Sequence, residues 1–213
     1  MNTFEQRRTY GASINRDLLR FIGSLEGSVL DIGCGQASWS SDLRAAGAAR
    51  VIGLEPDSVL ADIAAKHCDL VIESYLSEIT FLDNWNIKTV ILADVLEHLL
   101  DPWSLLREVH ERAEAGTRLF VSTPNLQSAS CLTRVAFKGE FEYSDGGGFM
   151  DRGHIRWFTH RSLARAVSLA GFSIVRIEGG KNAGRMSSLL KPFTTGSLRF
   201  LRSGALFLEA TVE

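Results

Sequence analysis

The sequence predicts an α/β protein with a mostly parallel sheet of seven strands, helices on both faces and an antiparallel strand pair at its C-terminal end. Strand-like and helix-like segments alternate regularly over residues 28–122, the pattern of parallel strands joined by crossover helices. Residues 89–93 are apolar throughout their centre, as expected for a strand covered on both faces. Residues 172–178 and 206–211 lack a clear helix between them, which favours an antiparallel pair.

The elements follow from hydrophobic periodicity and from turn residues. Strands are expected over residues 28–32, 50–54, 69–73, 89–93, 118–122, 172–178 and 206–211. Helices are expected over residues 4–23, 38–46, 57–67, 103–114 and 161–170. Gly47 and Gly171 follow two of these helices, where a glycine typically ends a helix, and Thr159 stands where a helix cap is expected.

Composition indicates a soluble globular protein with a hydrophobic core. The chain has 213 residues, of which 45% are hydrophobic and 23% charged, and its net charge of −2 gives no reason to expect a nucleic-acid partner. Its cysteines, Cys34, Cys68 and Cys131, are too widely spaced for a zinc motif and are expected to be reduced thiols. No signal peptide and no run of about 18 apolar residues is found, so we expect a cytoplasmic protein.

A glycine-containing turn follows the first strand. Gly33 and Gly35 allow a tight turn and close approach of the backbone to a ligand. Glu55 lies twenty residues beyond Gly35, at the end of the second strand, where a carboxylate can accept hydrogen bonds from both ribose hydroxyls of an adenosine. Nicotinamide, flavin and S-adenosylmethionine folds share this combination.

Asp31 distinguishes between these cofactors, because it stands directly before the glycines. An anionic side chain there would repel a pyrophosphate but suits the ammonium and sulfonium of S-adenosylmethionine. The third glycine of the dinucleotide pattern is also missing, and Ala37 stands near its place. Both features disfavour a nicotinamide-dependent oxidoreductase.

With these residues, the chain resembles the class I S-adenosylmethionine-dependent methyltransferases, in the small-molecule branch related to ubiquinone-biosynthesis O-methyltransferases. The resemblance covers residues 28–178 and departs from the family at Ala37, where many members have a third glycine. It is carried by Asp31-Ile-Gly-Cys-Gly35, Gly53-Leu-Glu55-Pro56, Ala93-Asp94-Val-Leu-Glu97-His98-Leu99, Phe120-Val-Ser-Thr-Pro124-Asn125 and the spacing of Thr159, Leu163 and Ala170-Gly171-Phe172.

The resemblance implies a Rossmann-like fold with S-adenosyl-L-methionine as cofactor. It implies one domain over residues 1–213, with an N-terminal helix (1–27), a cofactor-binding core (28–125), a substrate lid insert (126–160) and a C-terminal helix and strand pair (161–213). The implied cofactor contacts are Asp31, Gly33 and Gly35 for the methionine end, Glu55 for the ribose, Pro56 and Asp57 beside the adenine, Asp94 and Val95 at the floor near the sulfonium, and Tyr10 over the methionyl group.

Asp94, Glu97 and His98 lie on one turn and have two interpretations. Related enzymes with an acidic-x-x-acidic-His arrangement can use a divalent ion there, and three oxygen or nitrogen ligands could bind magnesium or manganese. The alternative is a solvated cluster near a helix cap. The signal is too short to predict metal ligands.

The insert at residues 126–160 combines aromatic residues, Gly146-Gly-Gly148 and histidines, which suits a lid over the methyl acceptor. His154 is the candidate general base, because its unperturbed pKa lies near neutrality. Asp151 could orient it if the segment is helical. A structural hydrogen-bonding role remains the alternative for both His154 and His160.

Residues 179–204 combine basic side chains with leucine and phenylalanine and contain no acid. Such a surface suits peripheral membrane contact or an anionic, lipid-linked acceptor. A homodimer contact or a packed flap explains the same composition.

We therefore expect methyl transfer to a hydroxyl of a small molecule, sugar or lipid-like acceptor. Nucleic-acid amino-methylating enzymes have Asn/Asp-Pro-Pro-aromatic where this chain has Ala93-Asp94-Val-Leu96, and the Pro-Cys dipeptide of cytosine C5 enzymes is absent. The alternative is a non-catalytic partner protein that only binds S-adenosylmethionine.

Overall fold

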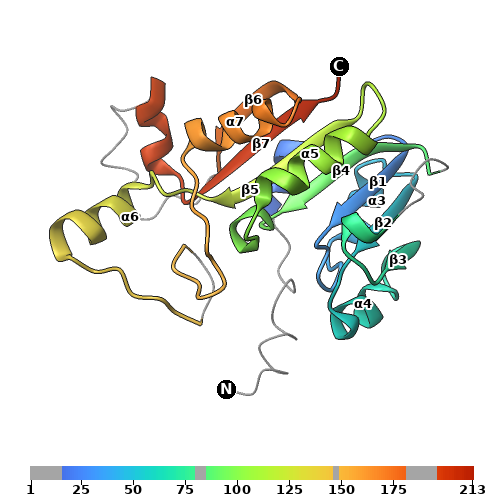
Figure 1. Cartoon of the computed structure of the whole chain (residues 1–213), viewed down its shortest axis with the longest axis horizontal. Coiled ribbons are helices and arrows are strands. Elements are labelled where there is room, and N and C mark those ends of the chain that lie inside the picture. Colours follow the sequence, from blue (N-terminus) through green and yellow to red (C-terminus); the bar gives the residue numbers. More distant parts are fainter. Residues whose placement is uncertain (1–15, 80–84, 146–148, 181–195) are drawn as a thin grey trace.

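The computed structural model describes residues 16–79, 85–145, 149–180 and 196–213. The strands are β1 (Ser28–Ile32), β2 (Arg50–Leu54), β3 (Leu70–Ile72), β4 (Ile87–Ala93), β5 (Arg118–Pro124), β6 (Ser173–Gly179) and β7 (Ala205–Thr211). They form one seven-stranded sheet in the order β3-β2-β1-β4-β5-β7-β6 (Figure 1). Strands β1 to β5 are parallel, and β7 is antiparallel to both β5 and β6. The predicted fold class is confirmed, including the terminal antiparallel pair.

The helices account for most of the connections. They are α2 (Arg16–Ile22), α3 (Ser40–Ala45), α4 (Ser58–Ala64), α5 (Pro102–Arg112), α6 (Ala129–Thr133) and α7 (His160–Leu169), with shorter turns η1 (Leu76–Glu78), η2 (Leu96–His98), η3 (Arg134–Lys138) and η5 (Gly196–Arg202). Thr159 caps α7 as predicted, accepting a hydrogen bond from the Ser162 amide. The helix expected over residues 4–23 is described only from Arg16, and Tyr10 lies outside the described residues.

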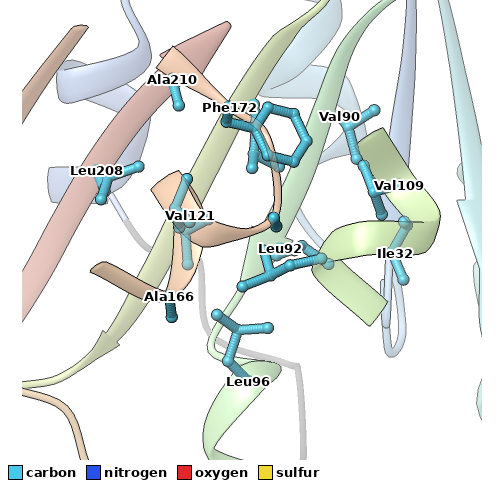
Figure 2. Close-up of a cluster of buried hydrophobic side chains, with 14 of the residues drawn as sticks. Ile32, Val90, Leu92, Leu96, Val109, Val121, Ala166, Phe172, Leu208 and Ala210 are labelled. Carbon is cyan, nitrogen blue, oxygen red and sulfur yellow. The ribbon is translucent and has the colours of Figure 1, made fainter. Parts of the chain in front are cut away.

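Both faces of the sheet are covered, because successive strand residues point to opposite sides. In β4, Val90 and Leu92 face one core and Ile91 faces the other. The first core is closed by α5 and α7, and Figure 2 shows Val109 and Ala166 of these helices facing Leu92 and neighbouring strand side chains. The second core is closed by α2 and α3. The all-apolar centre of β4 is explained by this double burial.

The insert at residues 126–160 is partly helical, and Gly146-Gly-Gly148, on which the predicted lid depends, lie outside the described residues. It contains α6 and η3, which the hydrophobic pattern did not predict, and Ser128 caps α6 by accepting from the Cys131 amide. Its far end returns to the sheet, where Leu126 N–H donates to Phe158 O at 2.9 Å and Phe158 is buried. Figure 1 shows α6 and the following loop projecting beyond the ends of β4 and β5. The insert is therefore anchored at both ends.

The last strand enters the sheet between β5 and β6 and brings a buried acid with it. Glu209 on β7 accepts from Arg118 on β5 at 2.9 Å and from Arg176 on β6 at 2.6 Å. The guanidinium of Arg176 also lies over the ring of Phe21 on α2, 4.1 Å from its centroid. This ionic cluster ties three adjacent strands and α2 together. None of the described helices is long and apolar enough to cross a membrane.

Candidate cofactor and acceptor site

The carboxyl ends of β1 and β4 lie side by side and bring two turns into contact. Gly33, after β1, has φ of 69°, and Gly35 has φ of 55°, a left-handed conformation that glycine adopts without strain. A Cβ on Gly33 would lie 2.8 Å from Cγ2 of Val95, which follows β4. Only glycine fits at this contact. The two predicted cofactor segments therefore form one edge, in the crevice where ligands bind in open α/β sheets.

Ala37 stands where many related proteins have glycine, and its backbone also has a positive φ of 53°. An L-residue in that conformation costs about 1–2 kcal/mol. Ala37 is buried, with 1% of its surface exposed, so the surrounding packing holds it there.

Glu55 ends β2 and lies against the glycine turn. Its Oε2 accepts from the Gly35 amide at 2.9 Å, and its Oε1 accepts from the Asp57 amide at 3.0 Å. Burial raises the pKa of this carboxyl, and the two amide hydrogen bonds oppose that rise. Asp57 itself caps α4 by accepting from the Val59 and Leu60 amides, while Pro56 is exposed. Glu55 thus stands where a ribose-binding carboxylate is expected.

Asp31 is the most enclosed acid of this edge. It is 1% exposed, and its Oδ2 accepts from the indole Nε1–H of Trp39 at 2.8 Å. Burial raises the pKa of Asp31 to about 7 despite that hydrogen bond. A cation bound beside it would favour the carboxylate form. This is the electrostatic environment that the ammonium and sulfonium groups of S-adenosylmethionine require.

Asp94 follows β4 in a left-handed conformation, with φ of 55°. Its amide donates to the Ser122 carbonyl oxygen at 3.2 Å, and its Oδ1 accepts from the Ser122 hydroxyl at 2.8 Å. These contacts to β5 hold Asp94 and Val95 in the predicted position beside the glycine turn. A non-glycine residue in this conformation is typical of a functional site.

Glu97, on η2, points into the protein and lacks a partner. It is 1% exposed, and neither of its carboxylate oxygens has a hydrogen-bond partner among the described residues. Burial, followed by the nearby charge of Asp94, raises the pKa of Glu97 well above its usual value. Its backbone carbonyl accepts from the Ile155 and Arg156 amides at 2.8 and 3.1 Å, so the insert is fastened to this turn.

His98 and His154 complete this end of the site. Their ring centroids are 4.7 Å apart at an interplanar angle of 68°. Nδ1 of His98 lies 3.0 Å from the Gly153 carbonyl oxygen, and Nδ1 of His154 lies 3.1 Å from that of Phe149. Because a carbonyl oxygen only accepts, Nδ1 carries the hydrogen in both rings and Nε2 carries the lone pair. Burial and the neighbouring His154 lower the pKa of His98, which favours the neutral ring.

The structure changes the expected pairing of Asp151 with His154. Residues 152–157 are not helical, and Asp151 Oδ1 accepts from the Gly153 amide at 2.8 Å. The ring of His154 is oriented by the Phe149 carbonyl instead. The negative charge of Asp151 acts on the other imidazole, where it opposes the fall in the pKa of His98 that burial and His154 cause. The condition on which Asp151 was to orient His154 is therefore not met.

The group formed by Glu97, His98 and His154 was not predicted as a unit. One ligand-type atom from each lies within 4.8 Å of the other two. His160 is not part of it, because its ring stacks on Phe200 at 4.2 Å and its Nδ1 lies 2.7 Å from Gln127 Oε1. No sequence spacing connects residues 97 and 98 with residue 154, since α5, β5 and most of the insert lie between them.

Comparison with known proteins agrees with this geometry. The methyltransferase domain family matches residues 4–177, and the chain belongs to that family. No curated protein sequence matches it.

Several solved structures share the fold at low sequence identity. A chain of the complex between the Haloferax volcanii Trm112 methyltransferase activator and a methyltransferase aligns with a TM-score of 0.65 and 16% identity, covering 98% of this chain and 92% of that one. Magnesium protoporphyrin IX methyltransferase from Synechocystis PCC 6803, with bound S-adenosylhomocysteine, aligns with 0.63 and 17%, covering 100% and 89%. The [4+2]-cyclase SpnF aligns with 0.61 and 17%, covering 92% and 79%.

Together the family and the site define a class I, Rossmann-like methyltransferase with S-adenosyl-L-methionine as its cofactor. The residues present fit that cofactor. Gly33 lets the turn after β1 pack against Val95, where a Cβ would lie 2.8 Å from Cγ2, and the buried carboxyls of Asp31 and Glu55 would hold the methionine end and the ribose of the cofactor.

Proposed function

We propose that this protein transfers a methyl group from S-adenosylmethionine to a hydroxyl of a small molecule, sugar or lipid-like acceptor. The observation that carries the proposal is the group of proton-accepting side chains directly beyond Asp94 and Val95. A ring nitrogen of His154 lies within 4.8 Å of ligand-type atoms of Glu97 and His98, and Nδ1 of the ring faces the Phe149 carbonyl oxygen. A hydroxyl nucleophile needs a nearby proton acceptor, and a buried neutral imidazole is well suited to that task.

The chain's own residues divide the work. S-adenosylmethionine supplies a methyl group activated by its sulfonium. Asp31 balances the positive charge of the methionine end, and Glu55 accepts hydrogen bonds from the ribose. Asp94 and Val95, held by Ser122, form the floor beside the sulfonium. His154 accepts the hydroxyl proton at Nε2, because its Nδ1–H is engaged with the Phe149 carbonyl. Alignment of the acceptor oxygen with the methyl group supplies the remaining catalysis.

The insert supports an apolar acceptor. The rings of Phe141, Tyr143, Phe149 and Trp157 form a continuous aromatic group, with centroid separations of 5.8 to 6.5 Å. Phe141 and Tyr143 are 44% and 46% exposed, so this surface is available to a ligand. Trp157 lies three residues from His154, which places the aromatic group close to the proposed base. An apolar or aromatic body with a hydroxyl group suits this arrangement.

The expected membrane contact is only partly described. Residues 181–195 lie outside the described residues, and η5 at the end of the segment packs back on the fold. Phe200 is buried, and Arg199 donates to the Ile177 carbonyl at 3.1 Å. For this protein, a peripheral membrane contact, a homodimer and a cytoplasmic location are further proposals. Equal sedimentation with liposomes of the wild type and of a variant lacking residues 181–195 would contradict the proposed membrane contact.

The alternative is binding of S-adenosylmethionine without methyl transfer. The structural neighbour named as a [4+2]-cyclase gives it some support, because its printed activity is not methyl transfer.

The experiment incubates the full chain with methyl-labelled S-adenosylmethionine and a panel of hydroxylated metabolites, phenols, sugars and lipid extracts. Label transfer by the wild type and not by His154→Gln supports hydroxyl methylation, with His67→Gln as a matched exposed control. Tight binding of S-adenosylhomocysteine in calorimetry without label transfer would support the non-catalytic alternative.

A further inference from the structure

We propose that Glu97, His98 and His154 form a binding site for a divalent transition-metal ion, with zinc, manganese or cobalt as the fitting class. Each residue offers one ligand atom, and these atoms lie within 4.8 Å of one another, close enough to surround one ion. Metal–ligand bonds to nitrogen and oxygen are about 2.0–2.2 Å long, so donor atoms on one ion lie about 3–4 Å apart.

Glu97 is the independent observation that points to a ligand. A buried carboxylate normally has an arginine, a lysine or several amides as partners, because an unpartnered charge in the interior is strongly destabilising. Glu97 is 1% exposed, neither of its oxygens has a hydrogen-bond partner of normal geometry, and no ion pair is formed with it among the described residues. The Thr123 hydroxyl favours the charged form of this carboxyl, but burial outweighs it. A cation between it and the two imidazoles would supply the missing charge.

The two histidines are oriented as metal ligands usually are. In such ligands the ring N–H that does not face the metal donates to a carboxylate or a backbone carbonyl, which fixes the tautomer. Here Nδ1 of His98 donates to Gly153 O and Nδ1 of His154 donates to Phe149 O. In a neutral ring of either residue, Nε2 is then the nitrogen that carries the lone pair. A Cβ on Gly153 would lie 2.9 Å from Nδ1 of His98, so the backbone approach that orients this ring requires glycine.

The ligand set selects the kind of ion. Two imidazole nitrogens and one carboxylate suit zinc, manganese, iron or cobalt, whereas magnesium and calcium prefer oxygen ligands. From the sequence, the possible ligands on one turn were Asp94, Glu97 and His98. The structure changes one member of that set. Asp94 Oδ1 accepts from Ser122, and the third ligand is His154, from the insert. Three protein ligands leave room for a further oxygen, as in catalytic sites.

This inference deepens the proposed function, and it rests on that function only for the role of the ion. An Nε2 atom that binds a metal cannot accept a proton. With the ion bound, the acceptor hydroxyl would bind to the open position, its pKa would be lowered by the cation, and its proton would leave to solvent. The ion would also fasten the insert to η2, because His154 belongs to the first and Glu97 to the second.

The test measures metal uptake separately from turnover. The full-length chain is stripped with a chelator and titrated with Co²⁺ and Mn²⁺, followed by calorimetry, by the visible spectrum of Co²⁺ and by electron paramagnetic resonance of Mn²⁺. We expect one Co²⁺ per chain without the strong near-ultraviolet band of thiolate ligands, which separates this site from the cysteines. Mg²⁺ should bind at least tenfold more weakly than Mn²⁺.

Glu97→Gln and His154→Gln should each weaken Co²⁺ binding about 100-fold or more, since a direct ligand matters at least as much as the outer residues whose loss costs 10–100-fold. The matched exposed controls Glu111→Gln and His67→Gln should bind like the wild type. Far-ultraviolet circular dichroism and binding of S-adenosylhomocysteine report whether each variant folds, and His98→Gln replaces one that does not.

The outcomes separate the two proposals. Absence of stoichiometric Co²⁺ uptake by the wild type, or equal uptake by Glu97→Gln and His154→Gln, overturns the ion site. Loss of methyl transfer in His154→Gln without any metal uptake supports the metal-free base and also overturns the ion site. Metal uptake that depends on Glu97 and His154, in a protein that transfers no methyl group to any acceptor, supports the ion site and contradicts the proposed function.

Discussion

Two of the buried glutamates, Glu209 and Glu97, differ sharply in the partners that the fold gives them. Glu209, 7% exposed, accepts from two guanidinium groups and lies at the junction of β5, β7 and β6. Glu97, 1% exposed, has no hydrogen-bond partner for either carboxylate oxygen and lies beyond the end of β4. The first is a buried charge whose environment was completed by the fold. The second is a buried carboxyl that has no such compensation within the protein.

The comparison teaches how to separate a structural acid from a functional one. A buried charge needs compensation, so the fold must supply it or a ligand must. Asp31 is intermediate, with one indole donor and a pKa raised by burial to about 7. Its compensation is expected from the cationic cofactor. The number of hydrogen-bond partners within the protein therefore falls from Glu209 to Asp31 to Glu97. The need for a bound ligand to compensate the buried acid rises in the same order.

The largest expected effect is on turnover. Glu97→Met should reduce methyl transfer by about 100-fold or more, the effect of removing a proton-transfer or ion-binding group, while binding of S-adenosylhomocysteine stays unchanged. Glu209→Met provides a control at a buried glutamate far from this site and should keep wild-type turnover at temperatures where it is folded. Rates are measured by label transfer to an acceptor identified in the panel. Near-wild-type turnover of Glu97→Met would show that its missing partners have no functional meaning.

The next effect is on stability and concerns Glu209. Glu209→Met should lower the free energy of unfolding by about 1–3 kcal/mol, because two arginines lose their partner. The value is placed below that of a fully buried pair because the side chains of Arg118 and Arg176 are 31% and 40% exposed. Urea unfolding followed by circular dichroism measures it. A change below about 0.5 kcal/mol would mean that this cluster is only a surface ion pair.

Cofactor affinity should depend on pH through Asp31. Because its pKa is raised to about 7 by burial, the carboxyl is increasingly protonated below that pH, and the cationic ligand must displace the proton. Affinity for S-adenosylhomocysteine should therefore rise with pH through 7 and be about tenfold weaker at pH 6 than at pH 8. Asp31→Asn should bind more weakly and lose this dependence. Calorimetry across pH 5.5 to 8.5 measures how affinity changes with pH. An equal change in the wild type and in Asp31→Asn would show that Asp31 is not the titrating group.

The smallest effect has the opposite sign to that of Glu209. In chelator-treated protein, Glu97→Met should leave stability unchanged or raise it by about 1 kcal/mol, since an apolar group of similar shape replaces an unsatisfied one. Burial raises the pKa of Glu97, so the folded state holds a proton that the unfolded chain releases. The carboxyl thus lowers wild-type stability as pH rises above its unfolded pKa of about 4.3.

The gain from Glu97→Met should accordingly be larger at pH 8 than at pH 5. Paired urea titrations of wild type and variant at the two pH values measure it. Destabilisation by Glu97→Met comparable to that by Glu209→Met would break the contrast between the two acids.

Local patterns were sufficient to predict much of the cofactor edge. Gly33, Gly35 and Glu55 are set by rules of short range, namely a strand, a tight turn and a second strand whose carboxyl end must meet the first. The helix cap at Thr159 and the C-terminal strand pair were also predictable. The bounds of α3, β3 and β4 differ from the prediction by one to two residues at an end, where backbone hydrogen bonds and periodicity give different limits.

Other features depend on contacts between distant segments. The entry of β7 between β5 and β6, and with it the partners of Glu209, is a choice among sheet orders that no local pattern specifies. The structure of the insert, with α6 and η3, depends on its anchorage at Phe158. The prediction that Asp151 orients His154 depended on a helix that the backbone does not form.

By itself, the sequence determined the fold class and the cofactor, because both follow from neighbouring residues and from alternation along the chain; the residues proposed to contact the cofactor stay a prediction. Only the tertiary structure decided that His154 lies against Glu97 and His98, that Asp151 does not orient it, and that Glu97 is enclosed without a partner. The physical reason is that burial and ligand geometry depend on how distant segments of the chain pack against one another. Two residues separated by more than fifty positions become neighbours only when the chain between them has folded.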